Sequence, residues 1–135
     1  MNINGRMICK RLHRGEDLLI AIKNLAASEK LDAAVVLSAV GCVSKFRVRD
    51  ASGVTIQELD EDCEILSLNG TVSQTRTHLH IACSKKDLST IGGHLVEGCI
   101  INTTCELILA ELPNIRFGVE QDKTTGYDEI IFQTK

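Results

Sequence analysis

Three of the four histidines in this chain, His78, His80 and His94, lie in two neighbouring segments that alternate apolar and polar residues. His78 and His80 are two positions apart, so in a β-strand both imidazoles point to the same face. Leu79 and Ile81 alternate with them and point the other way, toward the expected core. The pair of histidines therefore faces solvent, a cleft or a subunit interface.

The polar segment between the two histidine-bearing segments suits a hairpin loop. If Cys83 pairs with Ile91 across this hairpin, His80 lies directly opposite His94, with Cβ atoms about 4.5–5.5 Å apart. His78 is then a diagonal neighbour at roughly 7–8 Å. A slip of one residue in the register would turn His94 to the other face.

Three imidazoles on one patch are typical of a three-ligand site for a divalent metal with an open coordination position. Zinc is our first choice, and iron, nickel and copper accept the same ligands. The alternative is a group of ordinary exposed strand histidines, which a His-x-His pattern alone does not exclude. Gly92 and Gly93 would let another backbone or a ligand come close. His13 stands apart from this patch.

Two carboxylates are candidates for a supporting role, Glu64 and Glu97. In a continuous strand Glu97 alternates away from His94, and an unpaired buried charge is costly. Glu97 is therefore either partnered across a subunit boundary or exposed at an edge, and Glu106 raises the same two alternatives. If a bound metal were catalytic, Glu64 or Glu97 of a neighbouring subunit is a candidate proton carrier. No nucleophile elbow, P-loop or dinucleotide fingerprint occurs.

One helix and a set of strands must position these side chains. Apolar residues at helical spacing predict a helix from about residue 16 to residue 30, with Glu16 and Asp17 in its first turn. Asn69-Gly70 indicates a turn or bulge, and residues 33–39 are expected to be buried on both faces. Strands are expected at residues 6–12, 33–39, 46–50, 54–59, 64–72, 77–83, 91–111 and 130–132. The pattern predicts a single α/β (α+β) domain over residues 1–135, with a mostly antiparallel sheet and one main N-terminal helix.

The composition limits the functions open to the chain. Aromatic residues make up only 3% of the 135 residues, too few to build stacking platforms for single-stranded nucleic acid. The net charge of −3 argues against a dedicated duplex-DNA binder, which usually has a basic surplus. Six widely spaced cysteines without a C-x-x-C pair, and no apolar run of signal-peptide or membrane-spanning length, predict a cytoplasmic protein with reduced thiols and no membrane partner.

Several segments together resemble the plant-and-prokaryote-conserved (PPC) domain. They are Arg14-Gly-Glu-Asp-Leu18, Glu64-Ile-Leu-Ser-Leu-Asn-Gly70, His78-Leu-His80, Ile91-Gly-Gly-His-Leu-Val-Glu-Gly-Cys99, Thr103-Thr-Cys-Glu106 and Thr125-Gly-Tyr-Asp128. The resemblance implies a compact α/β fold that assembles as a homotrimer. It also implies that the three clustered histidines are metal ligands, as in the prokaryotic pattern.

Plant members of that family attach the domain to an AT-hook that grips the DNA minor groove. This sequence contains no Arg-Gly-Arg-Pro core and no basic arm, so we expect the stand-alone prokaryotic type and weak DNA binding at most. Our leading interpretation is a homotrimeric binding or regulatory module that holds a divalent metal and a small-molecule ligand. The two alternatives are a metal-dependent enzyme acting on a small molecule and a DNA-associated scaffold.

Overall fold

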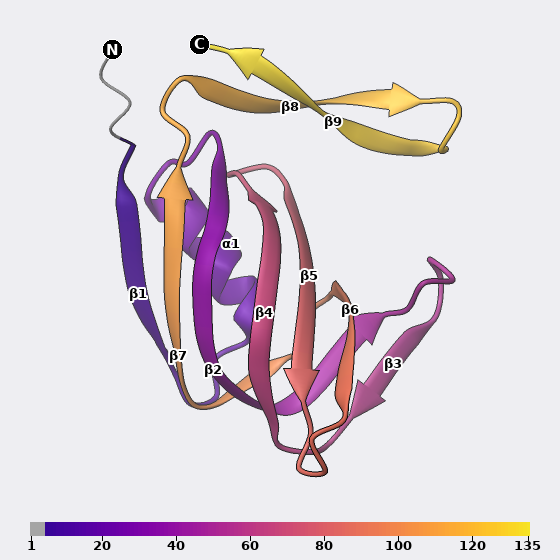
Figure 1. Cartoon of the computed structure of the whole chain (residues 1–135). Helices are drawn as coiled ribbons and strands as arrows, with labels where there is room; N and C mark the ends of the chain where they lie inside the picture. The colour runs from indigo at the N-terminus through magenta and orange to yellow at the C-terminus, as the bar shows by residue number, and fades with distance from the viewer. Residues whose placement is uncertain (1–4) are drawn as a thin grey trace.

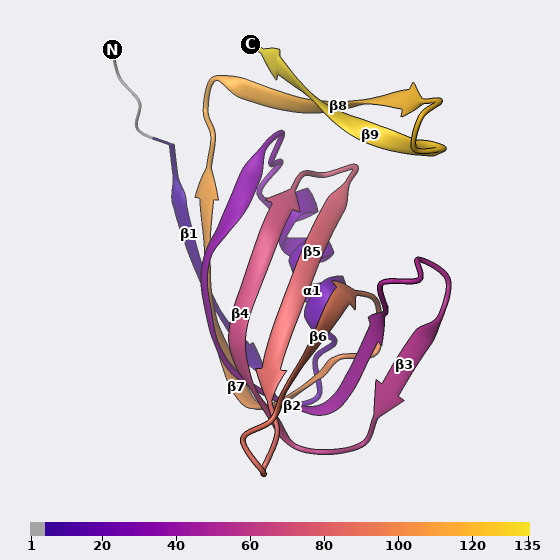
Figure 2. The same cartoon turned by 45° about the vertical axis from the view of Figure 1, so that its right-hand side comes forward.

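Alternating apolar residues place most of the chain in β-strands, and a computed structural model describes residues 5–135. One helix lies on one face of a strongly curved sheet (Figures 1 and 2). The elements are β1 (Met7–His13), α1 (Leu18–Ser28), β2 (Ala34–Arg49), β3 (Ile56–Leu59), β4 (Cys63–Val72), β5 (Thr77–Ser84), β6 (Thr90–Leu95), β7 (Ile100–Glu111), β8 (Ile115–Asp122) and β9 (Tyr127–Thr134). The predicted class, a mostly antiparallel sheet with one N-terminal helix, is confirmed.

The main sheet closes on itself through its longest strand. Its order is β1-β7-β2-β4-β5-β6, every pairing is antiparallel, and β3 adds to β2. The far end of β2 also pairs with β6, through Val48 with Leu95 and Arg49 with His94. Strands β2, β4, β5 and β6 therefore form a closed ring. The β-bulges along β2 help to bend this strand around the ring.

Helix α1 begins at an aspartate that holds two parts of the chain together. The Asp17 carboxylate accepts a hydrogen bond from the backbone N–H of Ile20 at 3.1 Å and another from that of Gly98 at 2.7 Å. Asp17 is thus the N-cap, not a first-turn residue as expected, because its side chain satisfies a free N–H of that turn. The apolar face of α1 is buried as predicted: Leu18, Leu19, Ile22, Leu25 and Ala26. No helix within residues 5–135 is long and apolar enough to cross a membrane.

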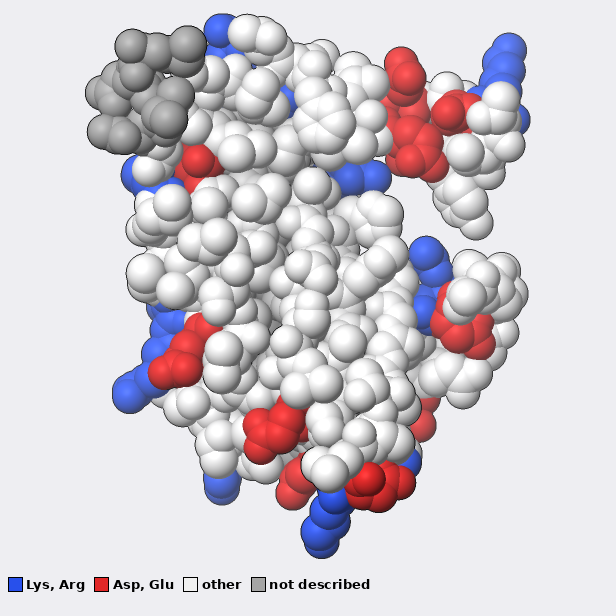
Figure 3. Space-filling model, in the orientation of Figure 1, with Lys and Arg blue, Asp and Glu red and all other residues white. Residues whose placement is uncertain are grey.

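The face of the sheet away from α1 is open and partly apolar. Residues 33–39 were expected to be buried on both faces, but Leu37 is 59% exposed. The expectation is wrong because the single helix covers only one side of β2. Val40 and Leu66 are exposed on the same side of the sheet. We call the surface formed by Leu37, Val40 and Leu66 the apolar outer face. Figure 3 shows that its middle and upper parts carry no charged side chains, which gather near its borders.

Three other strand predictions need correction. The strands expected at residues 33–39 and 46–50 are parts of one continuous strand, β2. The expected strand over residues 91–111 is divided into β6 and β7, because Gly98 adopts a left-handed φ of 114° that breaks the extended backbone. The end of the chain forms a long hairpin, β8 with β9, where only a short strand at residues 130–132 was expected. A polar turn at residues 123–126 connects these two strands.

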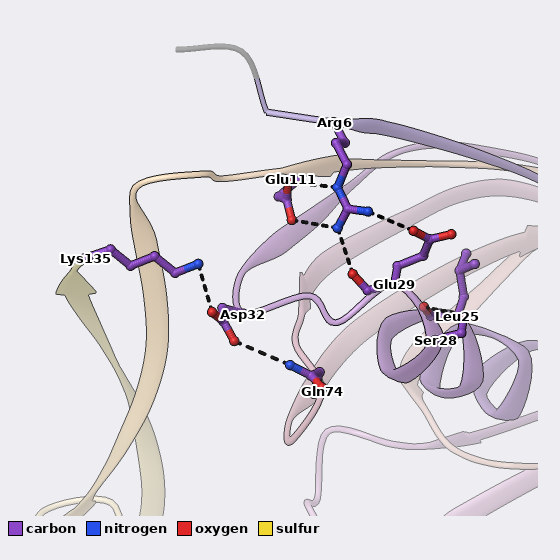
Figure 4. A network of polar contacts seen from close by, with 8 residues as sticks. All are labelled: Arg6, Leu25, Ser28, Glu29, Asp32, Gln74, Glu111 and Lys135. Carbon is purple, nitrogen blue, oxygen red and sulfur yellow. Dashed lines mark hydrogen bonds and ion pairs between the residues drawn. The ribbon is translucent and has the colours of Figure 1, made fainter. Parts of the chain in front are cut away.

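Ion pairs fasten the C-terminal hairpin and the end of α1 (Figure 4). Lys135 lies 2.8 Å from the Asp32 carboxylate, which ties β9 to the segment before β2. Arg6 reaches Glu29 at 2.8 Å and Glu111 at 3.0 Å. These contacts join the start of the chain, the C-cap of α1 and the end of β7.

Candidate metal centre

The β5–β6 hairpin brings the histidines together in the predicted register. Cys83 pairs with Ile91, and His80 lies directly opposite His94. His78 is one strand-repeat away on the same face of β5, opposite Thr71 of β4. The prediction that the three imidazoles share one patch is confirmed.

The three rings form a close triangle. The centroid distances are 5.1 Å between His78 and His80, 5.3 Å between His78 and His94, and 5.7 Å between His80 and His94. One nitrogen from each ring can be chosen so that all three lie within 4.8 Å of one another. A tetrahedral ion with bonds of about 2.0–2.1 Å holds its ligand nitrogens roughly 3.4 Å apart. To bind such an ion, side-chain rotation has to shorten the distances between the ring nitrogens by up to about 1.4 Å, from 4.8 Å to roughly 3.4 Å.

His94 is the least exposed of the three and has an unmet polar atom. His78 and His80 are exposed, whereas His94 is half-buried. The Nδ1 atom of His94 is buried and has no hydrogen-bond partner among the described residues. A buried ring nitrogen without a partner is costly. A metal bond, or a proton with a new acceptor, would remove that cost.

The surroundings favour the neutral form of two imidazoles. Burial lowers the pKa of His94 to about 4, and the positive charge of Arg49 adds to this effect. Burial also lowers the pKa of His78, with further contributions from His80 and Arg76. A neutral imidazole has a free lone pair, which is the form that binds a metal.

Two arginines flank the histidines, and our sequence reasoning did not identify either. Arg76 lies two residues before His78, directly before β5, so continuing the strand alternation backward could have placed it on the same face. Arg49 is brought next to His94 by the β2–β6 pairing, which no local pattern signals. Each guanidinium has a buried nitrogen without a hydrogen-bond partner among residues 5–135, Nε in Arg49 and Nη1 in Arg76. The patch is therefore rich in positive charge and donors.

Close strand packing explains the glycines beside the histidines. A Cβ on Gly92 would lie 2.6 Å from the Ile81 carbonyl oxygen. A Cβ on Gly93 would lie 2.8 Å from the Arg49 carbonyl oxygen. Both distances are shorter than real Cβ contacts, so glycine lets β6 approach β5 and β2. The prediction that another backbone comes close here is confirmed.

The predicted carboxylates lie apart from this patch within one chain. Glu64 is exposed on β4 opposite Ser84, whereas the histidines lie near the other end of the same strand pair. Glu97 is exposed in the turn after β6, and its carbonyl accepts a hydrogen bond from Arg47 at 2.9 Å. Glu106 is exposed on β7. A role for Glu64 or Glu97 across a subunit boundary stays a prediction.

The fold and the patch define an α+β domain with a closed β-ring that carries three histidines on its outer side. The chain belongs to the Plants and Prokaryotes Conserved (PCC) domain family, whose model matches residues 2–113. The resemblance inferred from the sequence motifs is thereby confirmed.

Three comparisons illustrate the likeness. A hypothetical protein from Salmonella cholerae-suis has a TM-score of 0.95 and 30% identity, covering 100% of this chain and 98% of that one. A metal-containing protein from Archaeoglobus fulgidus has a TM-score of 0.79 and 27% identity, covering 96% of both chains. A bifunctional protein GlmU from Synechococcus is 41% identical over 123 residues, which are 91% of this chain and 20% of that protein. The chain thus spans about a fifth of the length of the GlmU relative.

Proposed function

We propose that this protein is a homotrimeric binding module of the PPC type that holds a divalent metal, with zinc as first choice, on His78, His80 and His94. The observation that carries the proposal is the convergence of three ring nitrogens, one from each histidine, within 4.8 Å of one another. In addition, the Nδ1 atom of half-buried His94 has no hydrogen-bond partner among residues 5–135 and could bind the metal. Three imidazoles are a good ligand set for zinc and leave coordination positions for a ligand.

Two further facts support a metal at this place. The lowered pKa values of His78 and His94 keep these rings in their ligating form near neutral pH. A solved relative of the same fold, from Archaeoglobus fulgidus, is described as metal-containing. Iron, nickel and copper suit the same donors, so the ligands alone do not select the metal.

The apolar outer face supports self-association. Leu37, Val40 and Leu66 are 59%, 56% and 57% exposed, and they lie on neighbouring strands of one sheet face. Covering such a face with another copy of the chain removes apolar area from water. A closed trimer would use a heterologous contact, in which this face meets a different patch of the next subunit.

Metal content measured on untagged protein tests the proposal directly. After reconstitution with zinc near neutral pH, we expect about one zinc ion per chain, because each chain supplies all three histidine ligands of one site. Replacing His78, His80 or His94 by alanine should remove most of the affinity and leave the fold intact, because no imidazole belongs to the apolar core. His13→Ala is the matched control, since His13 is an exposed histidine on β1 outside the cluster. Wild-type metal content in the triple-alanine variant would overturn the proposal.

A metal-dependent enzyme is the second candidate, and one observation favours it. A hollow of about 380 Å³ lies directly beside the cluster and is lined by His80 and His94. When bound, a metal with an open position can polarise a carbonyl or lower the pKa of a bound water. Metal-dependent turnover of a small molecule, lost in His80→Ala, would support this candidate over a purely binding role.

A further inference from the structure

The hollow beside the histidines has one wall from β6 and another from the end of β2. His80 and His94 border it on one side, Gly92 and Gly93 contribute a wall without side chains, and Arg49 closes another side. Its volume of about 380 Å³ is at the lower end of the range for small-molecule sites. The space is therefore large enough for a small molecule next to the imidazoles.

Arg49 brings an uncompensated positive charge to this hollow. Its guanidinium makes no hydrogen bond or ion pair with any residue in the described part of the chain, and its Nε is buried. The adjacent Asp50 also lines the hollow but forms no ion pair with Arg49. The Asp50 carboxylate accepts hydrogen bonds from the Ser52 backbone and from the Gln57 amide, both at 2.9 Å. Arg49 thus has unused donors on the wall of a small cavity.

An anion is the ligand that this environment lacks. Three neutral imidazoles do not cancel the charge of a divalent metal, and no carboxylate of residues 5–135 belongs to the cluster, although Glu129 of β9 is near enough to act on His78. A guanidinium fork binds a carboxylate through two parallel hydrogen bonds. One arginine, with Asp50 on the rim, suits a singly charged anion better than a phosphate dianion, which would be repelled more strongly by Asp50.

We propose that this hollow binds a small carboxylate, which Arg49 holds by its guanidinium while one carboxylate oxygen faces the histidine cluster. This inference rests on the proposed metal site and names the class of ligand for its open position. The lining residues come from the end of β2 with the turn after it, and from β5 and β6.

Titration of Co²⁺-loaded protein with acetate tests the inference. The visible absorption of Co²⁺ reports its coordination, so acetate should change the spectrum of the wild-type protein in a saturable way. Arg49→Gln should take up Co²⁺ as the wild type does but bind acetate about tenfold or more weakly, since charge-assisted bidentate contacts are strong. Arg49→Lys keeps the charge without the fork and should fall between them.

Arg76→Gln is the matched control, because it removes the same charge near His78 while Arg76 does not line this hollow. Acetate binding that weakens equally in Arg76→Gln and Arg49→Gln would overturn the assignment to Arg49. Phosphate that binds more tightly than acetate would overturn the choice of a carboxylate. Wild-type protein that takes up Co²⁺ without responding to acetate refutes this inference alone. Wild-type protein that takes up no Co²⁺ refutes the metal site, and this inference with it.

Discussion

Replacing Gly93 by alanine should destabilise the protein, because the new methyl group would meet backbone. Its Cβ would lie 2.8 Å from the Arg49 carbonyl oxygen and 2.9 Å from Cγ2 of Val48. Ordinary contacts begin near 3.4 Å, so β6 and β2 must separate by about 0.6 Å, the difference between 3.4 and 2.8 Å. Overpacking of this kind costs about 1–3 kcal/mol. Alanine recovers roughly 0.5–1 kcal/mol of the entropic cost of glycine in a strand. We therefore expect a net loss of about 1–2 kcal/mol in the free energy of unfolding.

Urea denaturation of the metal-free protein, at one fixed protein concentration, measures this loss. Gly118→Ala on β8 is the control, because its Cβ would meet only side-chain atoms of Ile131 and Gln133 at 3.1–3.2 Å. Those side chains can move aside, so the control should be neutral or stabilised by up to about 1 kcal/mol. Equal stability changes in the two variants would refute the claim that the β2–β6 contact requires glycine at position 93.

Four other outcomes are expected. Zinc affinity should decline less between pH 6.5 and pH 5 than for three ordinary imidazoles, as calorimetry would show, because a pKa of about 4 keeps His94 neutral in this range and the pKa of His78 is also lowered; a steep loss below pH 6.5 would contradict this. Leu66→Glu should shift the sedimentation mass toward that of a 14.8 kDa monomer by placing a charge on the apolar outer face; an unchanged trimer would place the interface elsewhere. Asp17→Ala should lower the free energy of unfolding by about 1–2 kcal/mol, because the helix loses its N-cap; an unchanged urea midpoint would refute that role. Duplex DNA should bind weakly and without sequence preference at physiological salt, since the net charge is −3; tight, specific binding in a mobility-shift assay would disprove it.

The histidine cluster could be predicted because all its determinants are local. The alternation around His78 and His80 fixes their shared face, and the polar loop between β5 and β6 indicates a hairpin. The register of that hairpin was assumed, and the pairing of Cys83 with Ile91 confirms it. The same local logic located α1, whose apolar spacing is unambiguous. Its first residue was misjudged because a carboxylate before a helix suits both the N-cap and the first turn.

The remaining features depend on distant contacts. Arg49 reaches His94 only because β2 bends and pairs with β6, and nothing near Arg49 in the sequence indicates this. The face around Leu37 is open because one helix can cover only one side of the sheet. The continuous apolar run of residues 33–39 does not reveal this, since it is equally typical of a strand buried on both sides. The break at Gly98 requires a left-handed φ that the glycine permits but does not dictate.

The closed ring of β2, β4, β5 and β6 also implies an order of assembly during folding. His80 and His94 are 14 positions apart (94 − 80) and meet when one hairpin closes. Arg49 and His94 are 45 positions apart (94 − 49) and meet only when the ring shuts. The longer closure costs about 1 kcal/mol more chain entropy, from (3/2)RT ln(45/14). We expect the imidazole trio to form early on the nascent hairpin, where it is already able to capture an ion. The guanidinium then arrives with the last strand pairing, so the side chain proposed to hold the carboxylate is added after the proposed metal ligands are in place.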